Sequence, residues 1–241
     1  MSDEKKVKKH FSAGDRECRI CGSSDASFIL IQPCDDHDLE TGKEELEAIG
    51  AEKIPFLLVM VPVLDWGREL VPWKAKAPYG NTDFGSDAAG FLKLITGRVI
   101  PQTRILAPDA KLLIGGYSLA GFFALWSTFQ TDTFAGCAAA SPSVWVDGWI
   151  PYAQTHAPLA AVYSLSLGDK EARAKNPLLR SVGTCMNQQI DIFRKDIDEK
   201  CGSILNMNFQ MNPGNHFQNS GKRTGDAFAL AMRMLMNTGK Q

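Results

Sequence analysis

The sequence contains no apolar run long enough to span a membrane. Its best candidate, residues 55–64, falls well short of the about 20 residues that a transmembrane helix needs. The basic cluster at residues 5–9 is not followed by the long apolar core of a secretory signal, and internal repeats, low-complexity segments and linkers are lacking. We therefore expect a cytoplasmic protein folded as a single domain over residues 1–241, with residues 1–14 as a loosely attached N-terminal segment.

The sequence also lacks an excess of charge of either sign. Its 26 Lys and Arg against 27 Asp and Glu give a formal net charge of −1. Proteins that bind nucleic acid or an anionic membrane surface carry a basic patch or stripe. We therefore expect no nucleic acid and no membrane as partner, and we leave open whether the chain forms a homo-oligomer.

Cysteine is sparse, and its 6 residues fit free thiols in a reducing compartment. One group, Cys18, Cys21, Cys34 and His37, has the ligand count of a zinc site. Cys18 and Cys21 lie in a stretch with an extended pattern, where residues three apart point to opposite faces of a strand. We therefore expect neither a metal nor an organic cofactor, with zinc at these residues as the alternative.

Apolar strands and amphipathic helices alternate along the chain, which predicts an α/β fold with a mostly parallel central sheet and helices on both faces. Asp38 is expected to cap the first helix, and Pro101 is expected to end the second. Residues 63–84 form a long loop, which is typical of a functional segment. The expected strands cover residues 17–21, 28–32, 55–62, 112–115, 134–140, 161–167 and 204–211, and the expected helices cover residues 39–49, 86–99, 122–129, 178–200 and 226–236.

One apolar strand runs directly into Gly116-Tyr117-Ser118-Leu119-Ala120-Gly121, and an apolar helix follows. This order is typical of a nucleophile elbow, where a serine lies on a strained turn and needs small neighbours. Ala120 replaces the second glycine of the G-x-S-x-G pattern, and Gly121 follows it. The pattern predicts Ser118 as a nucleophile; the alternative is a glycine-rich loop whose serine only caps the helix.

A serine nucleophile needs a general base and an acid that orients the base. Among the four histidines, His216 lies in a loop after the last expected strand, which fits the order Ser, acid, His of such hydrolases. The loop after residues 161–167 offers Glu171 as the acid, with Asp169 in reserve. The sequence therefore predicts a triad of Ser118, His216 and Glu171.

Other parts of a substrate site follow from the same reasoning. Oxyanion donors are expected at the Leu119 amide and at the backbone of Cys34 or Asp35. The side chains of Asp35 and His37 either bind a polar substrate or form the turn. Aromatic residues of the long loop and of other connections are expected to wall the substrate site or to join the core: Trp66, Trp73, Tyr79, Tyr117, Trp145 and Trp149.

The sequence resembles the esterase family of the α/β-hydrolase superfamily that includes esterase D, feruloyl esterases, enterochelin-type siderophore esterases and the mycolyltransferases. The resemblance implies an α/β-hydrolase fold with Ser118 as nucleophile, Glu171 as acid and His216 as base. Two positions depart from the family pattern: Asn215 replaces a common glycine, and residues 32–33 replace a common His-Gly pair, which leaves the oxyanion hole less defined. The resemblance rests on residues 116–121, 141–145, 168–171 and 215–217.

Together these observations predict a serine carboxylic-ester hydrolase that cleaves a small-molecule ester through an acyl-enzyme. Two alternatives stay open: acyl transfer to an alcohol or thiol, and a non-catalytic binding protein with a hydrolase fold. The sequence does not predict which ester is the substrate, because loop geometry determines specificity.

Overall fold

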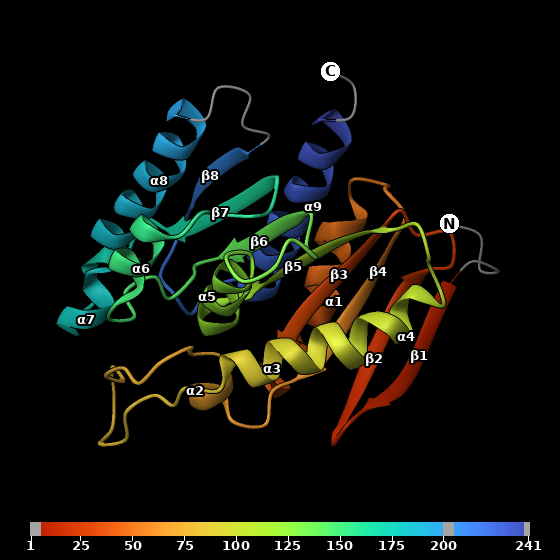
Figure 1. Ribbon diagram of the computed structural model, residues 1–241, viewed down its shortest axis with the longest axis horizontal. Coiled ribbons are helices and arrows are strands. Elements are labelled where there is room, and N and C mark those ends of the chain that lie inside the picture. The colour runs from red at the N-terminus through yellow and green to blue at the C-terminus, as the bar shows by residue number, and fades with distance from the viewer. Residues whose placement is uncertain (1–5, 200–204, 239–241) are drawn as a thin grey trace.

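The structure, a computed structural model, describes residues 6–199 and 205–238, and a single sheet of eight strands forms its centre (Figure 1). The order across the sheet is β1-β2-β4-β3-β5-β6-β7-β8. β1 and β2 pair antiparallel with their neighbours, and the pairs from β4 through β8 are parallel. The strands are β1 Lys6–Ala13, β2 Arg16–Ser23, β3 Phe28–Cys34, β4 Phe56–Pro62, β5 Lys111–Tyr117, β6 Gly136–Ala140, β7 Val162–Gly168 and β8 Asn206–Asn212.

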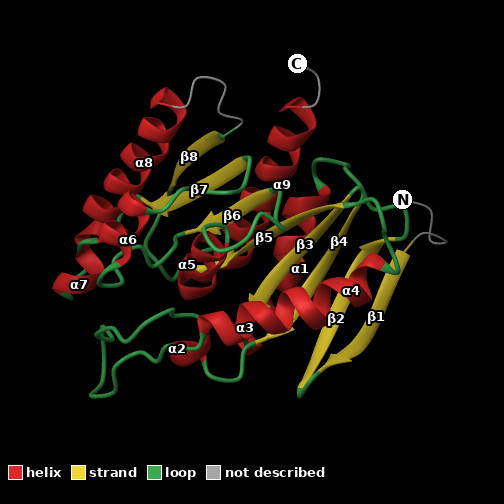
Figure 2. Ribbon diagram, viewed as in Figure 1, coloured by secondary structure: helices red, strands yellow, loops and turns green. Residues whose placement is uncertain are grey.

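Helices cover both faces of this sheet (Figure 2). The first and last long helices pack together on one face, and most of the others pack on the opposite face. None of the described helices is both long and apolar enough to cross a bilayer. The helical segments are α1 Asp36–Gly50, α2 Trp66–Glu69, α3 Ala88–Leu94, the π-helical η2 Ile95–Val99, α4 Ile100–Arg104, α5 Ser118–Ser127, α6 Trp149–Thr155, the 3₁₀ turn η3 Glu171–Arg173, α7 Pro177–Arg180, α8 Val182–Glu199 and α9 Ser220–Thr238.

The central strands are buried along their whole length because both faces of the sheet are covered. In β3, Ile29 and Ile31 join the core beneath α5, whereas Phe28 and Leu30 join the core beneath α1 and α9. This explains why β3 and β4 have continuous apolar runs rather than alternating ones. The prediction of an α/β fold with a mostly parallel sheet is confirmed.

The N-terminal segment differs from the expectation. Residues 6–13 form β1, which pairs with β2 along its whole length, for example Lys6 with Ser23 and Ala13 with Arg16. Ala13 is buried, and Val7 and Phe11 pack against the core. The expectation of a loosely attached segment is therefore wrong for residues 6–13, because ladder hydrogen bonds fix them; residues 1–5 lie outside the described residues.

Several helix boundaries also differ from those expected. Asp35, not Asp38, caps α1, and Asp38 completes a capping box by accepting the Asp35 amide. Pro101 does not end the second helix, because the wide turn η2 precedes it and Pro101 falls in the first turn of α4, where a missing N–H is tolerated. The helix expected over residues 178–200 is split at Ser181 into α7 and α8, and residue 200 lies outside the described residues. The last helix begins at Ser220 rather than 226.

Candidate active site

Ser118 lies on a sharp turn between β5 and α5. Its φ of +55° falls in the left-handed region, which is unusual for a residue other than glycine and is typical of a strained functional turn. The turn is also tightly packed: a Cβ on Gly116 would lie 2.7 Å from the Ala120 Cβ, and one on Gly121 would lie 2.8 Å from the Gly116 carbonyl oxygen. The small residues of the predicted elbow are therefore required by close backbone approach.

The structure brings Ser118, His216 and Glu171 together. His216 Nε2 is 2.9 Å from Ser118 Oγ, and His216 Nδ1 is 2.7 Å from Glu171 Oε2. Each residue follows a parallel strand, β5, β7 or β8, so all three lie at the same edge of the sheet. An imidazole held between a hydroxyl and a carboxylate in this way can take a proton from the hydroxyl while the carboxylate fixes its orientation.

The Glu171 carboxylate is surrounded by hydrogen-bond donors. Its side chain is 3% exposed, and its Oε1 accepts from Ser141 Oγ and from the Gly168 amide, each at 2.7 Å. The Arg223 guanidinium, also 3% exposed, donates to the same oxygen at 3.2 Å. Because a buried carboxylate is costly unless it is paired and hydrogen-bonded, these contacts make a charged acid tolerable here.

Arg223 also ties the elbow to the histidine loop. Its Nη1 donates to the Tyr117 hydroxyl at 3.0 Å, and its Nη2 donates to the Pro213 carbonyl at 2.8 Å. The Tyr117 hydroxyl in turn donates to the backbone carbonyl of His216 at 2.8 Å. Burial raises the pKa of the Tyr117 phenol, so this residue is a neutral donor. The residue before the candidate nucleophile therefore holds the candidate base in place.

The reserve acid Asp169 has a different contact. Its carboxylate accepts the Gly214 amide at 2.8 Å, and its own amide donates to the Asn212 carbonyl at 2.8 Å. These bonds join the loop after β7 to the loop after β8. Glu171, rather than Asp169, is the acid that contacts His216.

Of the two backbone positions expected to supply the second oxyanion donor, Asp35 already donates its N–H within the protein. Cys34 is part of the β3–β4 ladder, and its carbonyl accepts from the Val63 amide. The Asp35 amide donates to Asp38 Oδ2 at 3.1 Å. The capping box that starts α1 therefore uses the Asp35 donor. Leu119 lies in the first turn of α5, where backbone N–H groups have no partner within the helix.

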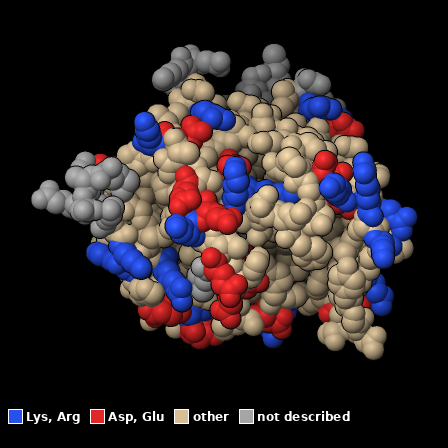
Figure 3. Space-filling view, turned by 180° about the vertical axis from the view of Figure 1, so that it is seen from behind, with Lys and Arg blue, Asp and Glu red and all other residues tan. Residues whose placement is uncertain are grey.

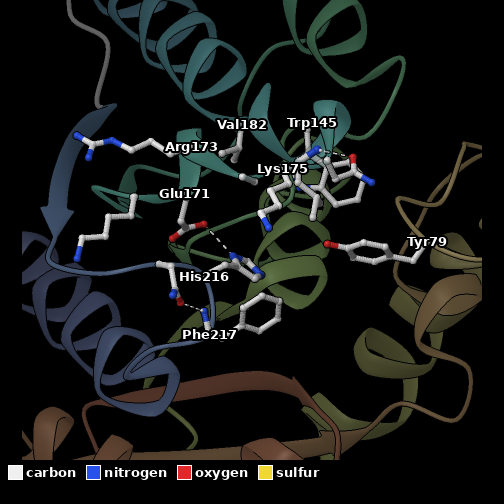
Figure 4. Close-up of a pocket in the computed structure, with 13 residues that line it drawn as sticks. Tyr79, Trp145, Glu171, Arg173, Lys175, Val182, His216 and Phe217 are labelled. Atoms are coloured by element: carbon white, nitrogen blue, oxygen red, sulfur yellow. Dashed lines mark hydrogen bonds and ion pairs between the residues drawn. The ribbon is translucent and has the colours of Figure 1, made fainter.

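A cavity of about 670 Å³ opens beside the imidazole and is called the His216 cavity (Figure 4). Tyr79 and Trp145 form part of its wall, as do Glu171 and His216 of the triad. Ser118 is not among its lining residues, so the cavity lies on the imidazole side of the triad. The remaining lining residues are Lys170, Arg173, Ala174, Lys175, Asn176, Leu179, Val182, Asn215 and Phe217.

The other aromatic residues that were expected to wall the substrate site or to join the core do not line the His216 cavity. Trp66 packs against the core from α2, and Trp73 donates its indole N–H to the Asp147 carbonyl at 2.7 Å. Tyr117 points to the His216 carbonyl, as described above. Trp149 is fully buried under α8, where it donates to Gln189 Oε1 at 2.8 Å. The indole N–H groups of Trp73 and Trp149 and the Tyr117 hydroxyl therefore have partners inside the protein.

The residues of the zinc alternative do not converge. Cys18 lies in the core on the α5 side of the sheet, whereas Cys21 and Cys34 contact the core on the α1 and α9 side. The His37 Nε2 is 3.3 Å from Ser220 Oγ, a contact between α1 and α9. Within the part of the chain that the structure describes, no three His, Cys, Asp or Glu side chains gather as metal ligands.

Sequence reasoning missed three polar residues at the site. Ser143 Oγ is 3.3 Å from Ser118 Oγ, and Ser141 and Arg223 contact Glu171. Ser141 and Ser143 stood out only through the family resemblance. Arg223 lies in the first turn of α9, which was expected to precede the helix. No motif in the sequence marks it as a partner of Glu171.

Comparisons with known proteins identify the fold. No protein-family model matches the sequence, and no curated protein sequence matches it. The siderophore hydrolase EstB from Aspergillus nidulans matches with a TM-score of 0.64 and 16% identity, over 95% of this chain and 94% of that one. An IroE-like serine hydrolase from Shewanella oneidensis matches with a TM-score of 0.70 and 14% identity, over 93% and 79%. The enterobactin esterase FES from Shigella flexneri matches with a TM-score of 0.60 and 13% identity, over 98% of this chain but 59% of that one. The chain therefore has the α/β-hydrolase fold.

Proposed function

We propose that the protein is a serine carboxylic-ester hydrolase with the triad Ser118, His216 and Glu171. The observation that carries this proposal is the continuous hydrogen-bond path from Ser118 Oγ through both ring nitrogens of His216 to Glu171 Oε2. The names hydrolase and esterase among structural relatives with the same fold support an ester as the substrate.

In the proposed reaction, Ser118 Oγ attacks the ester carbonyl while His216 Nε2 takes its proton. The Leu119 amide stabilises the oxyanion of the tetrahedral intermediate. The intermediate collapses when His216 returns the proton to the leaving alcohol, which leaves the acyl group on Ser118. Water then attacks the acyl-enzyme with His216 as base, and the acid is released. Glu171 keeps Nδ1 protonated and stabilises the imidazolium throughout.

A fluorophosphonate probe followed by intact mass spectrometry tests the nucleophile. We expect one adduct on the wild type and none on Ser118→Ala, with turnover of p-nitrophenyl esters in that variant reduced on the order of 10⁶-fold. Ser143→Ala is the matched control, because it removes the neighbouring hydroxyl and should still be labelled. An unlabelled wild type would favour the non-catalytic binding protein, and labelling of Ser118→Ala would assign the wrong nucleophile.

Adding competing alcohols to the same assay distinguishes hydrolysis from acyl transfer. For a hydrolase, we expect the free acid as the main product at all alcohol concentrations. A new ester that replaces the acid as alcohol is added would instead identify a transferase.

A further inference from the structure

The position of the His216 cavity identifies the part of the substrate that it receives. In acyl transfer through a serine, the imidazole that takes the serine proton later gives it to the leaving alcohol. The alcohol must therefore lie on the imidazole side of the nucleophile. Because His216 lines the cavity and Ser118 does not, the cavity is placed to hold the leaving alcohol rather than the acyl group.

The charged residues of this cavity are mostly basic. Lys170, Arg173 and Lys175 line it, and Glu171 is its one acidic lining residue. The Glu171 carboxylate is occupied by donors from the protein and by His216. None of the ion pairs formed among the described residues involves the three basic residues. On the face drawn in Figure 3, by contrast, basic and acidic side chains are interspersed.

Side-chain orientation distinguishes Lys175 from Arg173 (Figure 4). The Lys175 amine points toward the His216 ring, and the Tyr79 hydroxyl points into the same space from the opposite wall (Figure 4). The Arg173 head group turns away from that space. Trp145 and Phe217 add aromatic surface around it. The cavity therefore combines the Lys175 cation and the Tyr79 hydroxyl donor, both pointing inward, with a largely apolar lining.

We propose that the His216 cavity receives an alcohol or phenol leaving group with an anionic substituent on an apolar body, and that Lys175 and Tyr79 bind the anion. This inference rests on the proposed ester hydrolysis and specifies its substrate class. A lysine amine suits this role because it is a compact point charge with three donors on a flexible stem. An anion in the cavity supplies the partner that the protein does not provide.

Matched acetate esters test the proposal. The 3- and 4-carboxyphenyl acetates carry the anion on the leaving group, and the corresponding carboxamides are neutral and similar in shape. All form the same acetyl-enzyme, so they differ only in the acylation half of the reaction. We expect the ratio of kcat/KM for the carboxylate to that for the carboxamide to fall about tenfold in Lys175→Gln, the size of one hydrogen bond to a charged group.

Arg173→Gln is the charge-matched control, because it removes one positive charge from the same segment without removing a donor that points at the ligand. Its ratio should stay within about twofold of the wild type, because the Arg173 head group turns away from the space beside His216. An equal fall in both variants would show that the anion is attracted by the summed positive charge of the segment. This result would overturn the assignment to Lys175. An unchanged ratio in Lys175→Gln would overturn the proposal altogether.

Binding of the product alcohol tests the proposed anion site independently of the proposed ester hydrolysis. Isothermal titration with 3- and 4-hydroxybenzoate, against the hydroxybenzamides, requires no turnover. We expect at least one hydroxybenzoate to bind the wild type more tightly than its amide, with the difference lost in Lys175→Gln. If neither ester is cleaved but this preference holds, the hydrolase proposal fails and the anion site stands. If both esters are cleaved and no preference is found, the anion site fails alone.

Discussion

Two buried glutamates of this protein, Glu171 and Glu45, have opposite surroundings. Glu171 meets several donors, including the Arg223 guanidinium and the His216 imidazole. Glu45 is 1% exposed and meets a single donor, the Gln32 amide at 3.2 Å, and its Oε1 has no partner among the described residues. Burial raises the pKa of Glu45 to about 8. The comparison shows that burial alone favours a neutral carboxyl group, and that a charged buried acid needs a dedicated set of donors.

Replacing each glutamate by glutamine is expected to give the largest difference between the two sites. Glu171→Gln keeps the shape of the side chain but loses the carboxylate that fixes the His216 tautomer, so kcat for a neutral ester should fall about 10⁴-fold. Glu45→Gln, which lies outside the site, should leave kcat unchanged. Steady-state kinetics with thermal unfolding as a folding check measures both. A similar loss in the two variants would contradict the distinction.

Removing the cation beside Glu171 should give a smaller effect. In Arg223→Met the Glu171 carboxylate loses its buried positive partner. Glu171 is then, like Glu45, a buried acid without a cation beside it. Breaking a buried pair from one side costs about 3–5 kcal/mol, and urea unfolding at neutral pH should detect that loss. In the double variant with Glu171→Gln, part of the free energy of unfolding should return, because no unpaired charge is left. Strictly additive losses would show that Arg223 and Glu171 are not coupled.

The pH dependence of the free energy of unfolding tests Glu45, the second of the two buried glutamates. We expect this effect to be the smallest. Glu45 has a pKa raised from 4.5 to about 8 in the folded protein, so the folded state binds the proton more strongly than the unfolded state. Its contribution to stability is therefore present at and below about pH 4.5 and is lost as the pH rises through about 8. Relative to Glu45→Gln, the wild type should lose roughly 1 kcal/mol per pH unit between pH 5 and 8.

The quantity to measure is the difference in the free energy of unfolding between the wild type and Glu45→Gln. Burial also raises the pKa of Asp38, to about 7, and this adds a slope of the same sign to both. Because the Asp38 charge also raises the pKa of Glu45, the difference between wild type and Glu45→Gln in urea unfolding across the pH range reports Glu45 together with its interaction with Asp38. Parallel curves would mean that Glu45 is not neutral in the folded protein.

The sequence was sufficient to predict that Ser118, Glu171 and His216 come together, because each of them has a strong local signal. Ser118 lies in a strand, turn and helix pattern, and Glu171 and His216 follow strands whose ends had to meet at one edge of a parallel sheet. The same reasoning placed the helices on both faces of the sheet. Local patterns of this kind predict which residues follow a strand, because the spacing of apolar residues indicates where each strand runs.

The contacts around the triad could not be predicted in the same way. Arg223 reaches Glu171 from α9, across a separation in sequence that no local pattern encodes. Trp73 donates to the Asp147 carbonyl and does not line the His216 cavity, and no local pattern in the sequence indicates that partner. Pro101 failed to end a helix because the preceding turn is π-helical, which relieves the clash that a proline normally causes. These outcomes depend on tertiary packing rather than on propensity.

In the proposed reaction, the location of the His216 cavity also bears on the fate of the acyl-enzyme. Once the alcohol departs, the space it occupied is the route by which the next attacking hydroxyl reaches the acyl carbon, because the same ring nitrogen must activate it. Tyr79 and Phe217 at this space are 65% and 82% exposed, so bulk water can refill it as soon as it empties. A second alcohol would have to compete with solvent at an open entrance, which favours release of the free acid over transfer.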